Sequence, residues 1–430
     1  MKIAIWHNLP SGGGKRALYQ HVQGLVERGH TLEAWTLSTA DRSYLPLAPL
    51  ITEHVVAHET PPIGKLAGAL SDAFAGYRNA MKQIQAFDEA CARSAAEIDR
   101  REFDLVFVNS SYSFHMPYVI RHLRHRLKVL YLQEPCRPLY EADPILPWVG
   151  TVSEDEKPRW LNSVRRFAYD CMQLGVLRAQ ARHEWINAHA CDEILVNSYY
   201  SRESVARAYG CDARVCYLGI DTKQFRPLNY ERESFVVSVG AFNRFKDVEL
   251  ALKAIAQLPQ PRPSLVWVAN FSDEPYREAM SGLAVNLGVD LRLKPLVTDA
   301  ELIETLNRAA AFVYTPRLEP FGFAPLEANA CGTPVVAVAE GGVREVIRDG
   351  VNGLLVDREP AQIAAALDKL LRDKQFARRM GDTAVEYVQK EWNLKLSVDR
   401  LEERLFQILS TKSKDETELR LRTNRQCASC

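Results

Sequence analysis

Two glutamates with a predicted helix start between them are the strongest chemical feature of the sequence. Glu319 and Glu327 flank the run Phe-Gly-Phe-Ala, which follows an apolar, strand-like run. The first N–H groups of a helix have no partner within the helix, so those of Gly322, Phe323 and Ala324 can hold an anion. The flanking carboxylates repel phosphate but accept hydrogen bonds from hydroxyls, such as those of a sugar and a ribose. Phosphate between two polyols is the chemistry of a nucleotide sugar.

The alternative interpretation is that each glutamate, taken singly, is a surface carboxylate of a turn or a helix, and only the whole set of residues favours a site. A second glycine turn, Glu340-Gly341-Gly342, follows the next strand-like run and precedes another helix. It is predicted to belong to the same donor site.

Three consecutive glycines, Gly12, Gly13 and Gly14, follow the first strand-like run and precede a helical pattern. Glycines at this place leave room for a phosphate beside a helix N-terminus. The spacing excludes a P-loop, which needs an earlier glycine and a Ser or Thr after the lysine. Gly12, Gly14 and Ala17 fit the dinucleotide pattern G-x-G-x-x-A, but the second strand lacks the acidic residue at its end. A tight turn without a ligand is the remaining alternative.

The order of apolar runs predicts an α/β chain of two domains. Its length of 430 residues exceeds one ordinary core. Each half alternates strand-like and helical runs, as doubly wound parallel sheets require. The predicted strands are KIAIW, TLEAWTL, DLVFVNS, KVLYLQ, DEILVNS and ARVCYLG, then FVVSVG, PSLVWVAN, DLRLKP, AAFVYTP, TPVVAVA and NGLLV. Two long helical insertions are expected near 64–101 and 155–190.

The predicted boundaries follow from these runs. We expect Rossmann-like domains over 1–222 and 223–394, with their ligand edges facing across a cleft. Residues 395–410 should form a helix that packs back toward the first domain, and 411–430 should be a polar, disordered tail.

Composition excludes several classes of protein. The 54 basic and 54 acidic residues balance, so no nucleic-acid partner is expected. No apolar run approaches the roughly 18 residues needed to span a bilayer. Nine scattered cysteines indicate a reducing, cytoplasmic setting. Cys427 and Cys430 have the spacing of metal ligands, but no second pair lies near them, so no metal site is predicted.

The stretch EPFGFAPLEANACGTPVVAVAEGG resembles the donor site of retaining glycosyltransferases of family 4, which have the two-domain GT-B fold. The resemblance extends to the linker YLGIDTKQFRP and covers nearly the whole chain to about residue 410. It implies that Glu319 contacts the donor sugar and that Glu327 contacts the ribose. It also implies that Gly12, Gly13 and Gly14 lie against the donor diphosphate and the acceptor.

Lys15 and Arg16 follow these glycines directly. They either meet an acidic acceptor or are exposed charges at the helix start, and the sequence favours neither.

The chain departs from the family pattern at two places. Lys246 stands at the diphosphate-binding lysine position, but Ala241 replaces the usual arginine. Arg244 is the candidate substitute, with an exposed arginine as the alternative. Where many members have a histidine near the sugar, this chain has Gln133, and His115 is the nearest imidazole. A buried structural histidine is the favoured interpretation of His115.

The resemblance implies a hexosyltransferase that retains anomeric configuration and uses a nucleotide-diphosphate sugar as co-substrate, without a cofactor. No Asp-x-Asp pair is present to hold a bridging metal. The acceptor would be a hydroxyl of a glycan, a lipid-linked glycan or a small molecule. Three rivals remain open: a non-catalytic or differently reacting nucleotide-sugar binding protein, a glycosidase, and an NAD-dependent oxidoreductase.

A basic amphipathic helix over 157–182 raises the question of a peripheral membrane contact. Its apolar stripe and neighbouring arginines suit an anionic bilayer at the cytoplasmic face. Any surface helix needs one apolar stripe, so packing on the first domain is the favoured interpretation.

Overall fold

The computed structural model describes residues 1–59, 69–111, 114–124, 127–140, 160–295 and 297–427. In the helical segments 69–75, 160–170 and 412–427, and at residue 173, it describes the backbone alone. The chain divides into two compact units. The first comprises Met1–Val196, Arg202–Val215 and Glu402–Cys430, and the second comprises Asn197–Ser201 and Cys216–Leu401.

The first unit is built on a seven-stranded parallel sheet with the strand order β3-β2-β1-β4-β5-β6-β7. The six predicted strands are all present. The bounds are β1 Lys2–Asn8, β2 Thr31–Leu37, β3 Thr52–Val56, β4 Leu105–Ser111, β5 Leu127–Leu132, β6 Glu193–Val196 and β7 Arg214–Val215. The sequence prediction missed β3, which is a sheet-edge strand with a polar half, Thr-Glu-His, and therefore no apolar run.

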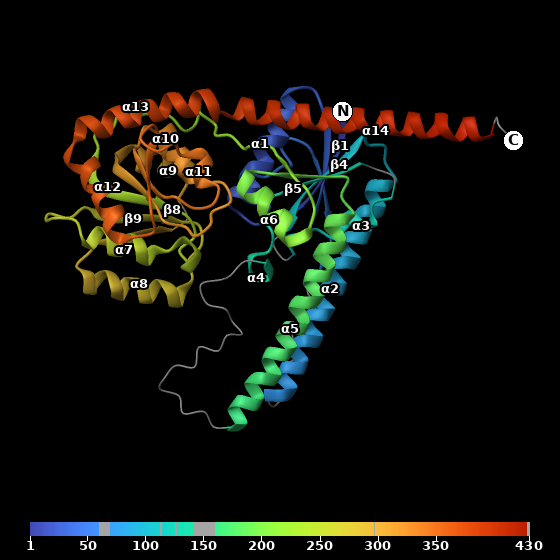
Figure 1. Cartoon of the computed structure of the whole chain (residues 1–430), viewed down its shortest axis with the longest axis horizontal. Coiled ribbons are helices and arrows are strands. Elements are labelled where there is room, and N and C mark those ends of the chain that lie inside the picture. The colour runs from blue at the N-terminus through green and yellow to red at the C-terminus, as the bar shows by residue number, and fades with distance from the viewer. Residues whose placement is uncertain (60–68, 112–113, 125–126, 141–159, 296, 428–430) are drawn as a thin grey trace. The chain divides into compact units, whose positions relative to one another are not determined.

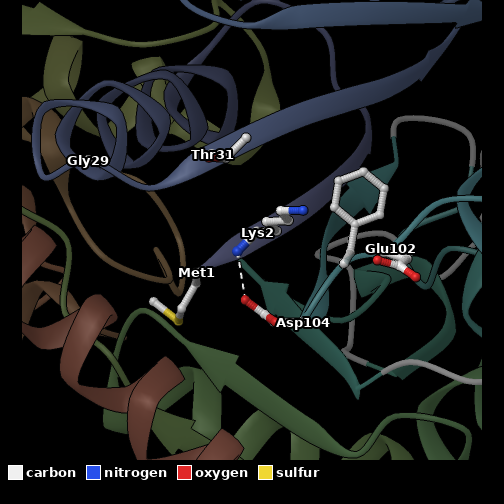
Figure 2. Close-up of a pocket in the computed structure, with 7 residues that line it drawn as sticks. Met1, Lys2, Gly29, Thr31, Glu102 and Asp104 are labelled. Atoms are coloured by element: carbon white, nitrogen blue, oxygen red, sulfur yellow. Dashed lines mark hydrogen bonds between the residues drawn. The ribbon is translucent and has the colours of Figure 1, made fainter.

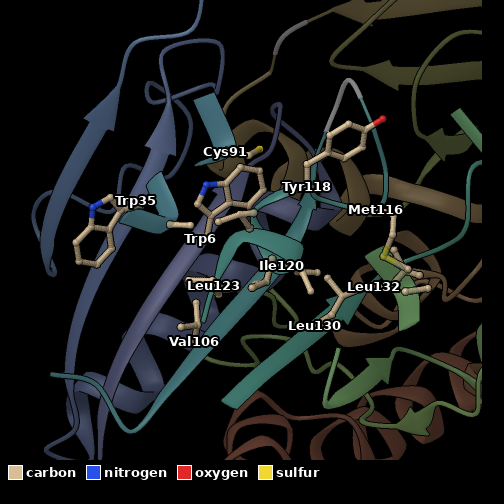
Figure 3. Packing of buried hydrophobic residues seen from close by; sticks show 14 of the residues in the cluster. Trp6, Trp35, Cys91, Val106, Met116, Tyr118, Ile120, Leu123, Leu130 and Leu132 are labelled. Carbon is tan, nitrogen blue, oxygen red and sulfur yellow. The ribbon is translucent and has the colours of Figure 1, made fainter. Parts of the chain in front are cut away.

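The helices of the first unit include the two long insertions. α2 (Ala69–Asp99) and α5 (Trp160–His189) run side by side away from the sheet (Figure 1). The others are α1 Gly13–Glu27, α3 Val119–His122, α4 Arg137–Tyr140 and α6 Tyr199–Tyr209. One face of the sheet packs on α2 and α3 through buried side chains that include Trp6, Trp35, Val106 and Tyr118 (Figure 3).

The second unit has a six-stranded parallel sheet with the order β10-β9-β8-β11-β12-β13. All six predicted strands are confirmed; most are buried apolar runs, whereas the edge strand β10 is largely exposed and contains Arg292 and Lys294. Their bounds are β8 Glu233–Val239, β9 Ser264–Ala269, β10 Leu291–Pro295, β11 Ala309–Tyr314, β12 Val335–Val338 and β13 Gly353–Val356.

The helices of the second unit cover this sheet. A 3-10 turn, η1 (Arg244–Lys246), precedes α7 (Val248–Ala256). The remaining helices are α8 Glu274–Leu287, α9 Asp299–Arg308, α10 Phe323–Ala330, α11 Val343–Val346, α12 Pro360–Arg372 and α13 Lys374–Glu391, and the first residues of α14 (Leu394–Cys427) also belong to this unit. Leu252, Ile255, Trp267 and Leu367 belong to its core.

The observed units differ from the predicted domain boundaries. The continuous part of the second unit begins at Cys216 rather than at residue 223, and Asn197–Ser201 also belong to this unit. The backbone of Ile220 explains this, since its N–H donates to the Trp392 carbonyl at 2.7 Å and its carbonyl accepts from Leu394 at 2.8 Å.

The C-terminal helix also differs from the prediction. α14 continues to Cys427, although 411–430 were expected to be disordered, because the segment through Cys427 holds good helix formers and neither Gly nor Pro. From Glu402 onward it belongs to the first unit. The Glu402 carboxylate pairs with Arg28 at 2.7 Å and with His30 at 2.7 Å.

No helix in the described part of the chain is both long enough and apolar enough to span a bilayer. A polar pocket in the first unit is lined by Met1, Lys2, Thr31, Asp104 and their neighbours, with the Lys2 N–H donating to Asp104 at 2.7 Å (Figure 2). These residues lie at the amino ends of β1, β2 and β4. Parallel α/β sheets bind ligands at the carboxyl ends of their strands, so this pocket receives no functional assignment.

Candidate active site

The turn after β8 positions the predicted phosphate-binding lysine. The Asn243 side chain accepts hydrogen bonds from the N–H groups of Phe245 and Lys246, at 3.1 and 3.3 Å, and so fixes the η1 turn. Gly240 has a φ of 150°, and a Cβ there would lie 3.4 Å from the Lys246 stem. Thr315, directly after β11, donates through its hydroxyl to the Lys246 carbonyl at 2.9 Å. The lysine is therefore held against the carboxyl end of the neighbouring strand.

Lys246 and Glu319, which are far apart in the sequence, meet in this structure. The Lys246 Nζ lies 2.6 Å from a Glu319 carboxylate oxygen, and the two side chains are 23% and 18% exposed. A partly exposed ion pair of this kind contributes about 0–1 kcal/mol. Lys246 can therefore exchange this carboxylate for a phosphate at little energetic cost.

α10 begins at Phe323, four residues beyond Glu319. Gly322 is the N-cap, with a φ of 111° that favours glycine, and no side chain caps the helix. The helix therefore begins where it was predicted to, and Phe323 and Ala324 lie in its first turn, whose N–H groups have no partner within the helix. Glu327 lies one turn inside α10 and is 5% exposed, so it is a buried carboxylate rather than a surface one.

Gly341 and Gly342 pack directly on the backbone of the Glu319 loop. A Cβ on Gly341 would lie 2.4 Å from the Glu319 carbonyl oxygen, and one on Gly342 would lie 2.0 Å from that of Pro320. The Gly342 N–H also donates to the Glu319 carbonyl at 2.7 Å. The glycine pair was predicted to bind the donor, and its observed contacts are with the loop that carries Glu319.

Arg358, which the sequence reasoning missed, ties the loops of this site together. Its guanidinium donates to both carboxylate oxygens of Glu340, at 2.7 and 2.6 Å, and to Asp247 at 2.9 Å. It also donates to the carbonyls of Thr315 and Pro316, both at 2.9 Å. Burial works against ionisation of Glu340, but the Arg358 ion pair lowers the pKa of that carboxyl. No motif in the sequence distinguishes Arg358 from other arginines that precede a helix.

Arg244 is exposed, with its guanidinium carbon 5.3 Å from the centre of the Phe245 ring. It lies in the same 3-10 turn as Lys246. The turn thus brings both predicted cations to the carboxyl end of β8.

In the first unit, the glycine run forms the N-terminus of α1. Gly12 is the N-cap with a φ of 139°, and the helix begins at Gly13. A Cβ on Gly14 would lie 3.8 Å from the Gln133 side chain and 3.5 Å from that of Leu9. The structure therefore places Gln133, at the end of β5, beside the glycine run.

Lys15 is fully buried and Arg16 is 8% exposed, so the alternative of exposed helix-start charges is wrong. The Lys15 Nζ has no hydrogen-bond partner among the described residues. Burial lowers the pKa of Lys15, and the negative charges of Glu53 and Asp41 oppose that effect. His7, whose pKa burial lowers to about 4, lies 3.6 Å from Glu53.

Two other predicted features lie elsewhere. His115 clusters with Cys136 and Glu184 in the first unit. The predicted basic amphipathic helix over 157–182 starts outside the described residues, and the side chains of 160–170 are also outside them. Membrane contact through this helix therefore stays a prediction.

Comparison with known proteins finds a family model that matches the part of the chain carrying Lys246 and Glu319. The family model for glycosyl transferases group 1 matches residues 219–387. A D-inositol 3-phosphate glycosyltransferase from Frankia alni is 36% identical over 188 residues, which is 39% of this chain and 46% of that protein. The homologous protein of Thermobifida fusca is 33% identical over 207 residues, or 45% of this chain and 48% of that protein. The chain thus spans about half the length of these curated relatives.

Solved structures resemble the whole chain. Sucrose-phosphate synthase from Thermosynechococcus elongatus has a TM-score of 0.71 at 19% identity, over 96% of this chain and all of that one. Anabaena Alr3699/HepE in complex with UDP-glucose has a TM-score of 0.68 at 18% identity, over 95% of this chain and all of that one. These likenesses establish the fold. The chain therefore has the GT-B fold, and its residues 219–387 match the family model for glycosyl transferases group 1.

Proposed function

We propose that this protein transfers a hexose from a UDP- or GDP-linked donor to a hydroxyl acceptor, with retention of anomeric configuration and without a metal in the transfer step. The observation that carries the proposal is the Lys246–Glu319 pair beside the uncapped N-terminus of α10. The Lys246 ammonium and the helix N-terminus can hold a diphosphate, and the Glu319 carboxylate can accept hydrogen bonds from the hydroxyls of a sugar joined to it. The family match over 219–387 covers the same residues.

In the proposed reaction, the residues of this site have different roles. As the sugar–phosphate bond breaks, negative charge grows on the leaving diphosphate. Lys246, Arg244 and the first N–H groups of α10 would stabilise that charge. Glu319 would accept hydrogen bonds from donor-sugar hydroxyls, and buried Glu327 from the ribose.

We assign acceptor binding to the first unit. Its glycine run presents the N-terminus of α1, with Gln133 beside Gly14. The buried Lys15 favours an acceptor with an acidic group, because an ammonium in this position gains from an anionic partner.

The test of the proposed function is nucleotide release from a panel of UDP- and GDP-sugars. UDP-glucose comes first, because Alr3699/HepE, a protein of the same fold, was solved in complex with it. Release that depends on an added hydroxyl acceptor supports a transferase. Binding of donor, seen as a raised melting temperature, without release for any acceptor would favour a nucleotide-sugar binding protein instead. Release of sugar from a glycoside without nucleotide would favour a glycosidase.

Glu327→Ala is expected to weaken binding of free nucleotide, whereas Glu319→Ala should lower turnover more than nucleotide affinity. The reason is that free UDP carries the ribose but lacks the donor sugar. Calorimetric titration of UDP or GDP into the two variants measures this difference. An equal loss of nucleotide affinity in both would contradict the division of roles.

Arg244→Ala is expected to lower turnover by less than Lys246→Ala does, because Arg244 is exposed and screened by solvent. Moving the arginine back to the family position, with Ala241→Arg added to Arg244→Ala, should restore activity. Steady-state kinetics of the single and double variants measure both effects. Full activity of Arg244→Ala would remove this residue from the site.

A further inference from the structure

In the first unit, three side chains of the types that bind metals come together from separate segments of the chain; Cys136 and Glu184 are buried and His115 is half-buried. His115 lies before α3, Cys136 directly before α4, and Glu184 near the end of α5. A nitrogen, a sulfur and a carboxylate oxygen from these residues lie within 4.8 Å of one another. The cluster does not depend on the transfer reaction proposed above.

The hydrogen bonds around the cluster satisfy the Glu184 carboxylate but leave one ring nitrogen of His115 without a partner among the described residues. Both carboxylate oxygens of Glu184 accept hydrogen bonds, from Gln180 at 3.1 Å and from the Tyr209 hydroxyl at 2.9 Å. Gln180 also lies 3.6 Å from the Cys136 sulfur. The buried Nδ1 of His115 has no partner among the described residues.

We propose that His115, Cys136 and Glu184 bind one Zn²⁺ ion. Imidazole, thiolate and carboxylate are the ligand types that zinc selects, and three protein ligands leave a fourth position for water. Zinc–ligand distances of about 2.0–2.3 Å place tetrahedral ligand atoms roughly 3.3–3.8 Å apart. The three ligand atoms lie within 4.8 Å of one another, so they would have to move closer together to bind one ion.

The surroundings of the three ligands suit a divalent cation. A thiolate and a carboxylate together neutralise Zn²⁺, so the bound site carries no net charge in the protein interior. Gln180 and Tyr209 supply the hydrogen bonds that commonly orient metal ligands from outside.

Zinc here would fix a loop that reaches the glycine run. Cys136 lies three residues after Gln133, and the Gln133 side chain lies beside Gly14. Binding would tie this loop to α5, on which Glu184 lies. Sequence reasoning missed the cluster because its ligands are far apart in the chain and share no metal-binding spacing.

The test is metal loading of the full-length protein. Purified protein is incubated with Zn²⁺, desalted and analysed for metal, and Co²⁺ is added separately to detect the absorption of a cobalt–thiolate bond. We expect one equivalent of zinc and a thiolate band in the wild type. Cys136→Ser and His115→Gln should lose more than about 100-fold in affinity, and Tyr209→Phe about 10–100-fold.

Two matched controls make the result specific. Cys171→Ser removes an exposed thiol of α5, and a Cys427→Ser/Cys430→Ser double variant removes the terminal pair. Both should retain the zinc and the cobalt band. Melting curves without metal establish that each variant is folded. No metal retained by the wild type, or equal metal in Cys136→Ser, would overturn the site and leave a hydrogen-bonded structural cluster.

Discussion

Lys246→Ala is expected to lower turnover by about 10²–10³-fold, equivalent to about 2.7–4 kcal/mol of barrier, while the fold stays intact. The side chain is 23% exposed and pairs with Glu319, so its loss removes little packing. Its cation lies at the carboxyl end of β8, where a diphosphate leaving group would gain charge. Steady-state kinetics with the donor identified by nucleotide release measure the loss.

Lys253→Ala is the matched control for this prediction. Lys253 also pairs with a carboxylate, Glu249 at 2.5 Å, but on the exposed face of α7. The Lys253→Ala substitution should leave turnover and melting temperature nearly unchanged. Wild-type activity in Lys246→Ala would end the assignment of this lysine to the leaving diphosphate.

Gly342→Ala is expected to disrupt the donor site through the backbone. The added Cβ would lie 2.0 Å from the Pro320 carbonyl oxygen and 2.7 Å from its carbon, so the Glu319 loop must move. Gly342 has a φ of –73°, which any residue adopts, so the effect is one of space and not of backbone strain. We expect a loss of about 1–3 kcal/mol in the free energy of unfolding, as for other overpacked sites. Turnover should fall with it, because Glu319 shifts relative to Lys246.

Gly282→Ala supplies the contrasting substitution in the same unit. Gly282 lies within α8, and nothing would lie within 4 Å of its added Cβ. Alanine there should raise the stability by about 0.4–1 kcal/mol and leave turnover unchanged. Melting curves and kinetics of the two alanine variants form the comparison. If Gly342→Ala were as stable and as active as wild type, the close packing of the glycine pair would not position Glu319.

The sequence by itself determined the two parallel sheets and the helix that begins after Gly322. Buried parallel strands are continuous apolar runs, and a glycine N-cap with Pro325 in the first turn is a local signal. Such features depend only on residues that are adjacent in the sequence, so they can be predicted without knowledge of the tertiary structure. The exception was β3, whose Thr-Glu-His start hides an edge strand that only pairing with β2 defines.

Tertiary structure decided which of the candidate residues meet. The contact of Lys246 with Glu319, the packing of Gly342 on Pro320 and the burial of Lys15 all depend on loops at the ends of separate strands. Arg358 carries no motif, and its role arises because its guanidinium reaches three segments at once. Side-chain types and spacing predict a local chemistry, but contacts between distant segments are set by strand order, which brings the carboxyl ends of neighbouring parallel strands to one edge.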